Sequence, residues 1–387
     1  MPAPKNHAVL SASSAHRWLN CPGSVSLTKD MPDTKSEYAE EGRLAHAVAE
    51  LKLRKKFLEP MGARAYTTRM NKLKKDPLYQ TEMDSCTDQY LDYITDLANS
   101  MAAKPFIAVE KRVDFSSFVP EGFGTADCVM IQGSDLYVTD YKHGKGVPVS
   151  AENNPQLMLY GLGALMEYET VYDIKTVRLA IVQPRAGGVN EYSITRDALI
   201  DWGVFTVRSI AEKAAGDCGE YHRGDWCRFC KARAVCRENS AVISAVEDFG
   251  GKKPPLLTDA EVGRLLKLAD PLVKYIDAIK AYAEQVLLAG SEIPGWKLVE
   301  GRSKRDWDNM DEAFSALKAA GIQDEMLWHK EPYSLSYLEK QLGKKTFQEI
   351  AGGHVVKYPG KPTLAPETDK RPAYAAKPTA AEDFTNL

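Results

Sequence analysis

The stretch Gly124-Thr-Ala-Asp-Cys-Val-Met-Ile-Gln-Gly-Ser-Asp-Leu-Tyr-Val-Thr-Asp-Tyr-Lys142 decides the fold that we expect for this chain. Residues 125–131 and 136–142 are rich in side chains that favour strands, and the turn-forming residues Gln-Gly-Ser-Asp separate them. Two such runs divided by a short polar turn predict an antiparallel β-hairpin.

The hairpin would carry two acids and a lysine. Side chains two residues apart in a strand share a face, so Asp140 and Lys142 project together while Tyr141 turns away. Asp127 begins the partner strand, where it can approach Asp140. Neighbouring carboxylates repel unless a cation lies between them, and oxygen ligands suit Mg²⁺ or Mn²⁺. Lys142 could stabilise negative charge on a phosphate, although ordinary surface hairpins also carry such residues.

Composition limits the class of protein. A length of 387 residues allows two or three domains, and an apolar content of 44% is enough for sizeable cores. The net charge of −3 excludes a globally basic nucleic-acid coat, so any DNA-binding surface must be local. No apolar run is long enough to span a membrane, and residues 1–7 lack a signal-peptide pattern. We therefore expect a cytoplasmic protein, in which seven cysteines indicate thiols or metal ligands rather than disulfides.

Helices and strands are expected on both sides of the hairpin. Ser11 or Ser13 could cap a short helix that ends near Cys21. The hydrophobic periodicity predicts helices over 37–56, 80–101 and 152–168, and strands over Phe106–Val113, Val177–Gln183 and Glu191–Thr195. This order implies a mixed sheet flanked by helices.

Several polar residues on these elements are candidates for a site. His46 and Glu50 share a helix face, although a lone helical histidine is more often packed or solvent-facing than a ligand. Glu110 lies in an otherwise apolar strand, where it could be an edge charge. Gln156 and Tyr160 are one helical turn apart.

The residues that follow the hairpin, Lys142-His-Gly-Lys-Gly-Val-Pro148, form a basic glycine-rich loop. A phosphate backbone could approach this loop closely, and an ordinary turn explains it equally well.

A second signal comes from three cysteines spaced as C-x2-C-x5-C: Cys227, Cys230 and Cys236. This spacing in a cytoplasmic chain indicates ligation of zinc or a 4Fe–4S cluster, and both prefer four ligands. The fourth ligand could be Cys218, which is near in sequence, or the distant Cys21. Cys86 and Cys128 lie in helix and strand patterns that predict burial.

Four motifs, taken in this order, resemble those of RecB-type nucleases in the PD-(D/E)XK superfamily: Gly42-x-x-x-His46, Gly124-Thr-Ala-Asp127, Asp140-Tyr-Lys142 and Gln156-x-x-x-Tyr160. The match covers roughly residues 8–240. The flanking cysteines resemble the iron–sulfur subgroup, which includes the AddB nuclease domain and CRISPR-adaptation nucleases. The whole chain is also similar to an uncharacterised family of phage and prophage RecB-like proteins, down to the late segment Gly360–Pro372.

The resemblance implies a restriction-endonuclease-like mixed sheet with a divalent metal site. Its metal ligands would be His46, Asp127, Asp140 and the backbone carbonyl of Tyr141. Glu110 matches an acid that is common in the strand before the hairpin.

The remaining motif residues would serve catalysis. By the resemblance, Lys142 orients the attacking water and stabilises the transition state, while Gln156 and Tyr160 hold the substrate strand or the metal's water shell.

For the cysteines, the resemblance implies that Cys21 joins Cys227, Cys230 and Cys236 around a 4Fe–4S cluster, with Zn²⁺ as the alternative. Such a cluster would clasp the two ends of the nuclease domain, and Cys218 would be a bystander.

The function implied is a metal-dependent DNA exonuclease of phage or prophage origin, which acts in recombination or DNA processing in the bacterial cytoplasm. Its partners would be DNA and a phage single-strand-annealing protein. The alternatives are a non-catalytic DNA-binding or assembly module that retains the fold, and a zinc-stapled RNA-processing enzyme.

Composition predicts the following divisions of the chain: a nuclease domain over 1–249, a linker over 250–257, a helical segment over 258–290, a small α/β accessory domain over 291–370 and a flexible tail over 371–387. In the accessory domain, residues 295–307 form a basic tip with tryptophans. This tip could grip nucleic acid, and a solvated hairpin is at least as good an explanation.

Overall fold

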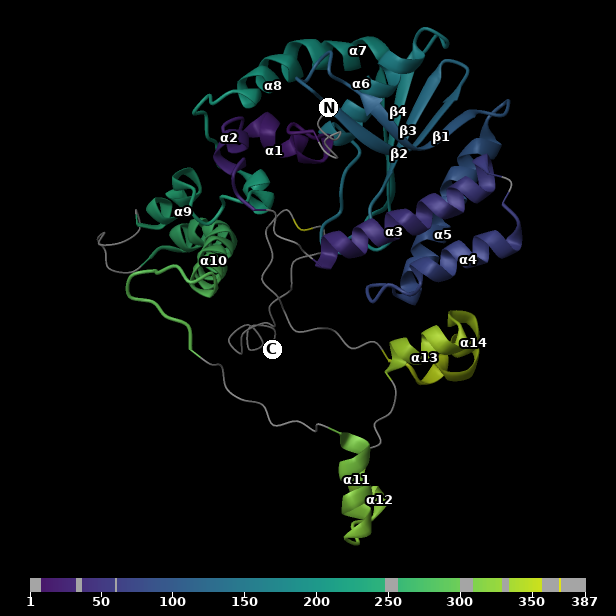
Figure 1. Ribbon diagram of the computed structural model, residues 1–387, viewed down its shortest axis with the longest axis vertical. Helices are drawn as coiled ribbons and strands as arrows, with labels where there is room; N and C mark the ends of the chain where they lie inside the picture. Colours follow the sequence, from purple (N-terminus) through teal and green to yellow (C-terminus); the bar gives the residue numbers. More distant parts are fainter. Residues whose placement is uncertain are drawn as a thin grey trace, which may run out of the picture. The chain divides into compact units, whose positions relative to one another are not determined.

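A five-stranded mixed β-sheet forms the centre of the computed structural model, which describes residues 8–32, 37–59, 61–247, 257–299, 309–328, 334–356 and 369. The strands lie side by side in chain order (Figure 1). They are β1 (Phe106–Asp114), β2 (Phe123–Gln132), β3 (Asp135–Tyr141), β4 (Thr176–Gln183) and β5 (Gly188–Thr195). All neighbours are antiparallel except β3 and β4, which are parallel. The expected mixed sheet is therefore confirmed.

Strands β2 and β3 form the predicted hairpin. Ile131 pairs with Leu136 and Gln132 with Asp135, so a two-residue turn joins the strands. Gly133 in this turn has a φ of +59°, a conformation that glycine adopts without the steric cost of a side chain.

The parallel pair β3 and β4 needs a crossover connection, which helix α6 (Pro155–Tyr168) supplies. The side chain of Asn154 accepts hydrogen bonds from two N–H groups of the first turn, and Pro155 occupies a position where no N–H is needed. A Cβ on Gly163 would come within 2.9 Å of the Cβ of Val113. Glycine therefore lets α6 lie close against β1.

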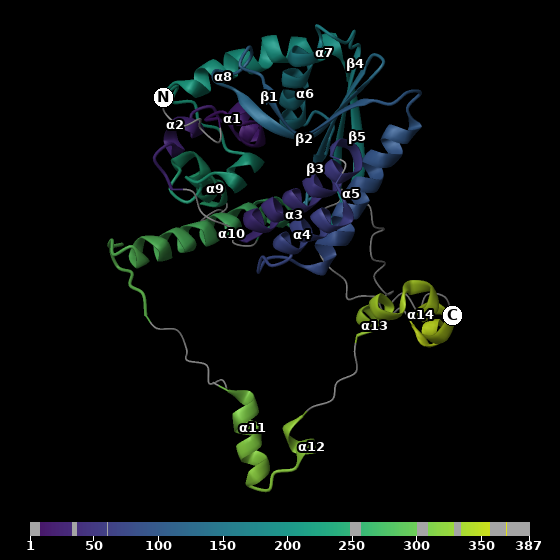
Figure 2. The ribbon, with the colours of Figure 1, turned by 45° about the vertical axis from the view of Figure 1, so that its right-hand side comes forward.

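Helices cover both faces of the sheet (Figures 1 and 2). Successive residues of β2 enter opposite cores: Val129 and Ile131 enter one, and Cys128 and Met130 enter the other. The first core packs against α6, α1 (Ala15–Asn20), α7 (Arg196–Trp202) and α8 (Arg208–Ala215). The second packs against α3 (Glu37–Leu53), α4 (Ala63–Leu73) and α5 (Thr81–Ser100). Burial of Cys86 and Cys128 in the second core agrees with the sequence.

Shorter elements complete this part of the chain: η1 (Ala12–Ser14), α2 (Ser24–Thr28), the π-helical segments η2 (Arg54–Leu58) and η3 (Gly203–Val207), η4 (Asp225–Phe229), α9 (Arg237–Glu247) and α10 (Asp259–Leu288). Thr258 and Glu261 form the predicted capping box at the start of α10. None of the helices in the described ranges combines the length and apolar character that crossing a bilayer requires.

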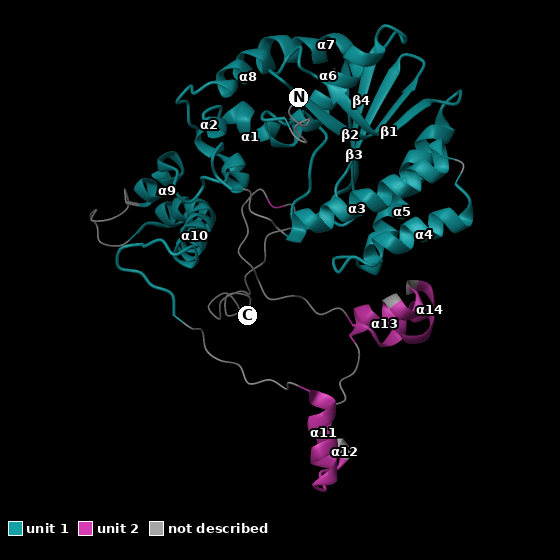
Figure 3. Ribbon diagram, viewed as in Figure 1, with its two compact units in different colours: residues 1–299 teal, residues 300–387 magenta. Residues whose placement is uncertain are grey.

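The chain divides into two compact units, residues 1–299 and 300–387 (Figure 3). Helix α10, which was expected outside the nuclease domain, belongs to the first unit. The second contains α11 (Met310–Ala319), α12 (Asp324–Leu327), α13 (Leu335–Leu342), α14 (Lys344–Ala351) and η5 (Gly352–His354). Its described residues form no strand, so they do not show the α/β arrangement expected over 291–370.

Several expectations for the C-terminal third fall on residues that the structure does not describe. Of the predicted tip over 295–307, the described part up to Val299 shows one isolated bridge, between Ile293 and Trp296. The tail over 371–387, the linker up to residue 256 and all of the segment 360–372 except Asp369 lie outside the described ranges.

Candidate active site

The candidate site lies where β2 and β3 separate. The ladder between the two strands ends at the pair Cys128 and Thr139, so Asp127 and Asp140 lie just beyond it. The side chain of Asp127 takes the place of the next ladder acceptor, because its Oδ2 accepts a hydrogen bond of 2.7 Å from the N–H of Tyr141. This separation places two buried acids at one end of the sheet.

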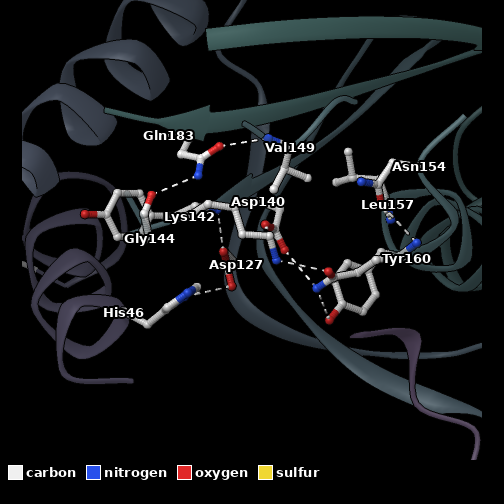
Figure 4. Close-up of polar contacts among 12 residues, drawn as sticks. His46, Asp127, Asp140, Lys142, Gly144, Val149, Asn154, Leu157, Tyr160 and Gln183 are labelled. Carbon is white, nitrogen blue, oxygen red and sulfur yellow. Dashed lines mark hydrogen bonds and ion pairs between the residues drawn. The ribbon is translucent and has the colours of Figure 1, made fainter. Parts of the chain in front are cut away.

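Three potential metal ligands meet at this point. His46 comes from α3, Glu110 from β1 and Asp127 from β2, and one ligand atom of each lies within 4.8 Å of the other two. Nδ1 of His46 lies 3.3 Å from Oδ1 of Asp127 (Figure 4). Imidazole with two carboxylates is a donor set that suits Mn²⁺, and the oxygen atoms also suit Mg²⁺.

Glu110 has an unusual backbone conformation. Its φ is +50°, although it lies within β1, and its two neighbours pair with Cys128 and Ala126. Glu110 therefore faces Asp127 across the strands. A non-glycine residue in this conformation costs about 1–3 kcal/mol, and such strain clusters at functional sites.

A second group of side chains lies beside these three (Figure 4). Nζ of Lys142 lies 3.0 Å from Oδ2 of Asp140 and donates to Oε1 of Gln156 at 3.0 Å. Nε2 of Gln156 lies 3.1 Å from Oδ1 of Asp140 and 3.2 Å from the hydroxyl of Tyr160. Asp140 and Lys142 thus share a face, as the strand pattern predicts, and α6 brings Gln156 and Tyr160 to them. The side chain of Tyr141 lies in the opposite core.

Burial and mutual charge change the protonation of these groups. Burial raises the pKa of Glu110 to about 7, and the nearby Asp127 adds to the rise. For His46, burial lowers the pKa, but the charges of Asp127 and Asp140 outweigh it and bring the pKa to about 9. Burial also raises the pKa of Asp140, against the effect of Lys142. These pKa shifts show carboxylates crowded in a site that favours added positive charge.

Of the expected ligands, His46 and Asp127 cluster with Glu110. Asp140 lies beside them in contact with Lys142 and Gln156, and its use as a ligand stays a prediction. Tyr141 contacts Asp127 through its N–H, and the use of its carbonyl as a ligand stays a prediction.

Two amide side chains that were not identified from the sequence, the buried Gln183 and the half-buried Asn190, hold the loop after Lys142. Gln183, at the end of β4, accepts from the N–H of Val149 and donates to the carbonyls of Gly144 and Val147 (Figure 4). Asn190 of β5 bonds the backbone of Val149 and Ala151. These bonds fix the connection between β3 and α6. They thereby fix the polar side chains of the β3 end relative to those of α6.

A buried ion pair, also missed from the sequence, ties α3 to the sheet. Nη1 of Arg185, in the turn after β4, lies 2.7 Å from Oε1 of Glu41 in α3 and donates to the carbonyl of His143. Nε2 of His143 lies 3.4 Å from the same Glu41 oxygen, and its Nδ1 lies 2.8 Å from the hydroxyl of Tyr141. The ring of Tyr141 meets that of His46 edge-on at 5.5 Å. The network therefore fixes the helix that presents His46.

The motif cysteines surround a separate pocket. Cys21, Cys227, Cys230 and Cys236 all line a cavity with a free volume of about 20 Å³. The described lining does not include Cys218. Four sulfur ligands of one zinc, each 2.3 Å from the metal, lie about 3.8 Å apart. Among the residues that the structure describes, no three of these thiols come within 4.8 Å of one another.

Comparisons with known proteins add a family. One solved structure, titled "Crystal structure of SSO0001", is 15% identical and matches 62% of this chain and 89% of its own, with a TM-score of 0.29. A similarity of this size supports no structural inference. The family described as "Protein of unknown function (DUF2800)" matches residues 7–372. The chain therefore belongs to the DUF2800 family.

Proposed function

We propose that this chain is a metal-dependent deoxyribonuclease of the RecB-type PD-(D/E)XK group, acting on DNA ends as an exonuclease. The observation that supports this most strongly is the meeting of two side-chain groups where β2 and β3 separate. One group offers metal ligands, and the other places the ammonium of Lys142 between Asp140 and Gln156. A charged lysine beside clustered carboxylates is the arrangement that hydrolysis of a phosphodiester needs.

The residues of the chain have separable roles in this proposal. His46, Glu110 and Asp127 would hold Mg²⁺ or Mn²⁺, with Asp140 close by. When bound, such a cation supplies a Lewis acid and a water molecule of lowered pKa.

Lys142 would stabilise the negative charge on the non-bridging phosphate oxygens while the water oxygen bonds to phosphorus and the bond from phosphorus to the sugar oxygen breaks, the sugar oxygen leaving with a proton. The Lys142 side chain is 27% exposed, so its Nζ can reach a substrate. The Asp140 side chain, which is 3% exposed, holds this Nζ through the ion pair. Gln156 would orient both, because it bonds Asp140, Lys142 and Tyr160.

The cysteines would hold a 4Fe–4S cluster with a structural role. This proposal is supported by the common pocket of Cys21, Cys227, Cys230 and Cys236. Iron and sulfide analysis of anaerobically purified protein would test it, and a colourless protein with stoichiometric zinc would reverse it.

The biological setting follows from the resemblance. We infer a role in phage or prophage recombination in a bacterial cytoplasm, with a single-strand-annealing protein as partner. Co-purification of the two proteins from cells that express both would support this partner.

The decisive experiment is a nuclease assay with Mg²⁺ and with Mn²⁺ on end-labelled linear DNA, circular DNA and single strands. We expect release of nucleotides from linear substrates, abolished in Asp140→Ala and Lys142→Ala. The matched controls are Asp173→Ala and Lys104→Ala, which remove the same side chains from exposed positions.

Outcomes of this assay separate the alternatives. A folded wild-type protein that binds DNA but cleaves none of these substrates with either metal favours the non-catalytic binding module. Cleavage of RNA but not DNA favours an RNA-processing enzyme.

A further inference from the structure

One short stretch of the chain is strongly basic. Residues 54–75 contain eight of the 50 lysines and arginines but only one of the 53 acids, Glu59. The rest of the chain therefore has 42 basic and 52 acidic side chains. This stretch comprises η2 and α4, which packs on the outside of α3 (Figures 1 and 2).

Five of these eight positive charges have no acidic partner in the described part of the chain, and one of the five, Lys55, lies over the ring of Tyr66. Arg54, Arg69 and Lys74 pair with Glu59, Glu50 or Asp84. In contrast, Lys56, Arg64, Lys72 and Lys75 are exposed and form no ion pair within the described part of the chain. We call these four residues the basic face.

The helical period places most of the basic face on one side of α4. Counted from Arg64, the residues seven, eight and eleven positions later lie on the same side of the helix or just past its end. They are Asn71, Lys72 and Lys75. Met70, on another side of α4, is buried in the core against α3. The stripe is thus presented to solvent while the helix itself is held firmly.

Contacts connect the basic face to the candidate active site through the first turn of α5. Lys74, next to Lys75, lies 2.6 Å from Asp84 in that turn. Lys145, three residues after Lys142, lies 4.0 Å from Glu82 in the same turn. The first turn of α5, with its acids Glu82 and Asp84, thus lies between Lys145 in the loop after Lys142 and Lys74 at the end of α4.

We propose that the phosphate backbone of DNA binds along the basic face on its way to the active site. The identity of the polyanion rests on the proposed function, but the surface itself rests on the charges described above. From Arg64 to its last residue, Leu73, α4 is about 14 Å long, which along a duplex axis corresponds to about four phosphates of one strand, and Lys75 lies two residues further on. Such contacts give affinity without sequence preference.

An anionic membrane fits this surface less well. Helices that lie on membranes carry large apolar side chains on the face opposite their charges, exposed for insertion. No large hydrophobic residue of α4 is exposed. The surface therefore has the charge but not the apolar area for lipid.

The test measures DNA binding against NaCl concentration with the full chain in EDTA, so that no cleavage intervenes. The variant is Arg64→Gln/Lys72→Gln/Lys75→Gln, and the control is Lys104→Gln/Lys175→Gln/Lys213→Gln, which removes the same charge from other exposed sites. Loss of three phosphate contacts should lower the slope of log K against log salt by about 2 to 3 and weaken binding roughly tenfold or more at low salt. The control should match the wild type.

Three results would overturn the inference: equal slopes for the two triple variants, no DNA binding by the wild type, or a larger loss of binding to anionic phosphatidylserine vesicles than to DNA. The result is independent of the nuclease assay. If the wild type cleaves DNA and both triples bind equally, the basic face is wrong and the nuclease stands. If DNA binding depends on the basic face but no substrate is cleaved, the basic face stands and the nuclease proposal is wrong.

Discussion

The candidate active site and the cysteine pocket both join residues that are far apart in sequence, but their side chains are held in different ways. At the active site, each of Asp127, Asp140, Lys142 and Gln156 contacts at least one other polar group of the site or its backbone. The four thiols line one pocket without three of them converging.

The difference follows from the chemistry of the two ligand sets. Carboxylates, ammonium and amide groups attract one another, so they can hold a geometry by charge and hydrogen bonding. Neutral thiols are weak donors and weak acceptors, and burial raises the pKa of Cys227 and Cys230, which disfavours the thiolate. We therefore expect the cysteine region to depend for its stability on the proposed cluster, and the active site to depend on its own contacts.

The largest expected effect is on the cysteine side of the comparison. Cys21→Ser should destabilise the first unit by about 5 kcal/mol, because in the proposed set Cys21 alone links the N-terminal end to the segment 227–236 and so closes a loop of about 200 residues. Chemical denaturation of the protein purified with its bound group measures this. Cys218→Ser is the matched control, since Cys218 is not among the pocket residues. Equal stability of the two variants would contradict the link.

At the active site, Asp127→Asn should leave the fold intact but reduce metal affinity. The amide oxygen can still accept from the N–H of Tyr141, while the charge next to His46 and Glu110 is lost. We expect Mn²⁺ binding to weaken by more than the 10–100-fold typical of changes outside the ligand set. Calorimetric titration with Mn²⁺ measures it, with Asp135→Asn as control. Unchanged affinity would remove Asp127 from the proposed metal site.

A smaller effect is expected from the ion pair that positions α3. Arg185→Gln and Glu41→Gln should each weaken Mn²⁺ binding about 10–100-fold, because His46 is no longer held against Asp127. Arg178→Gln, which breaks the Arg178–Asp135 pair on an exposed part of the sheet, is the control.

Because Arg185 is buried, its replacement also costs stability, and Mn²⁺ affinity must be measured on protein shown to be folded. Rescue of affinity by Arg185→Lys, which restores the charge, would support positioning. Loss of stability with unchanged affinity would show a purely structural role.

A structural feature of this protein could be predicted from the sequence when neighbouring residues determine it, and could not when residues far apart in sequence do. The hairpin around Gly133 follows from a local pattern, which is why it was predicted correctly. The helix predicted over 152–168 was also found, as α6, although it begins three residues later, at Pro155 after its cap Asn154. Helix α4 and the continuous helical stretch 196–215 were missed, because basic residues and a π-helical segment interrupt their apolar periodicity.

Within the site, sequence spacing predicted the pairing of Asp140 with Lys142 but not the partners that fix it. Arg185 and Glu41 are 144 positions apart, so no local pattern relates them. The left-handed backbone of Glu110 is equally invisible in sequence, since only the fold forces a glutamate into that conformation. Residue types therefore predicted which polar side chains lie together, and tertiary contacts decided that Glu110 lies closest to His46 and Asp127.

The smallest effect concerns pH and sharpens the comparison from the active-site side. Glu110 and His46 both have raised pKa values in the folded protein, at about 7 and about 9, so the folded state binds more protons than the unfolded one. Stability of metal-free protein should therefore fall as pH rises, from 4.5 to 7 for Glu110 and from 6.5 to 9 for His46. The part due to His46 should be on the order of 1 kcal/mol, because solvent screens this partly exposed pair.

Denaturation in EDTA across this pH range measures the slope, and His46→Gln should remove its upper part. Saturating Mn²⁺ should also abolish the fall, since a bound cation replaces the protons that hold these carboxylates together. If the wild type and His46→Gln show the same slope above pH 7, the charge of His46 does not hold the site. In that case the contacts that hold the active-site side chains without a bound ion would be those of Lys142 and Gln156.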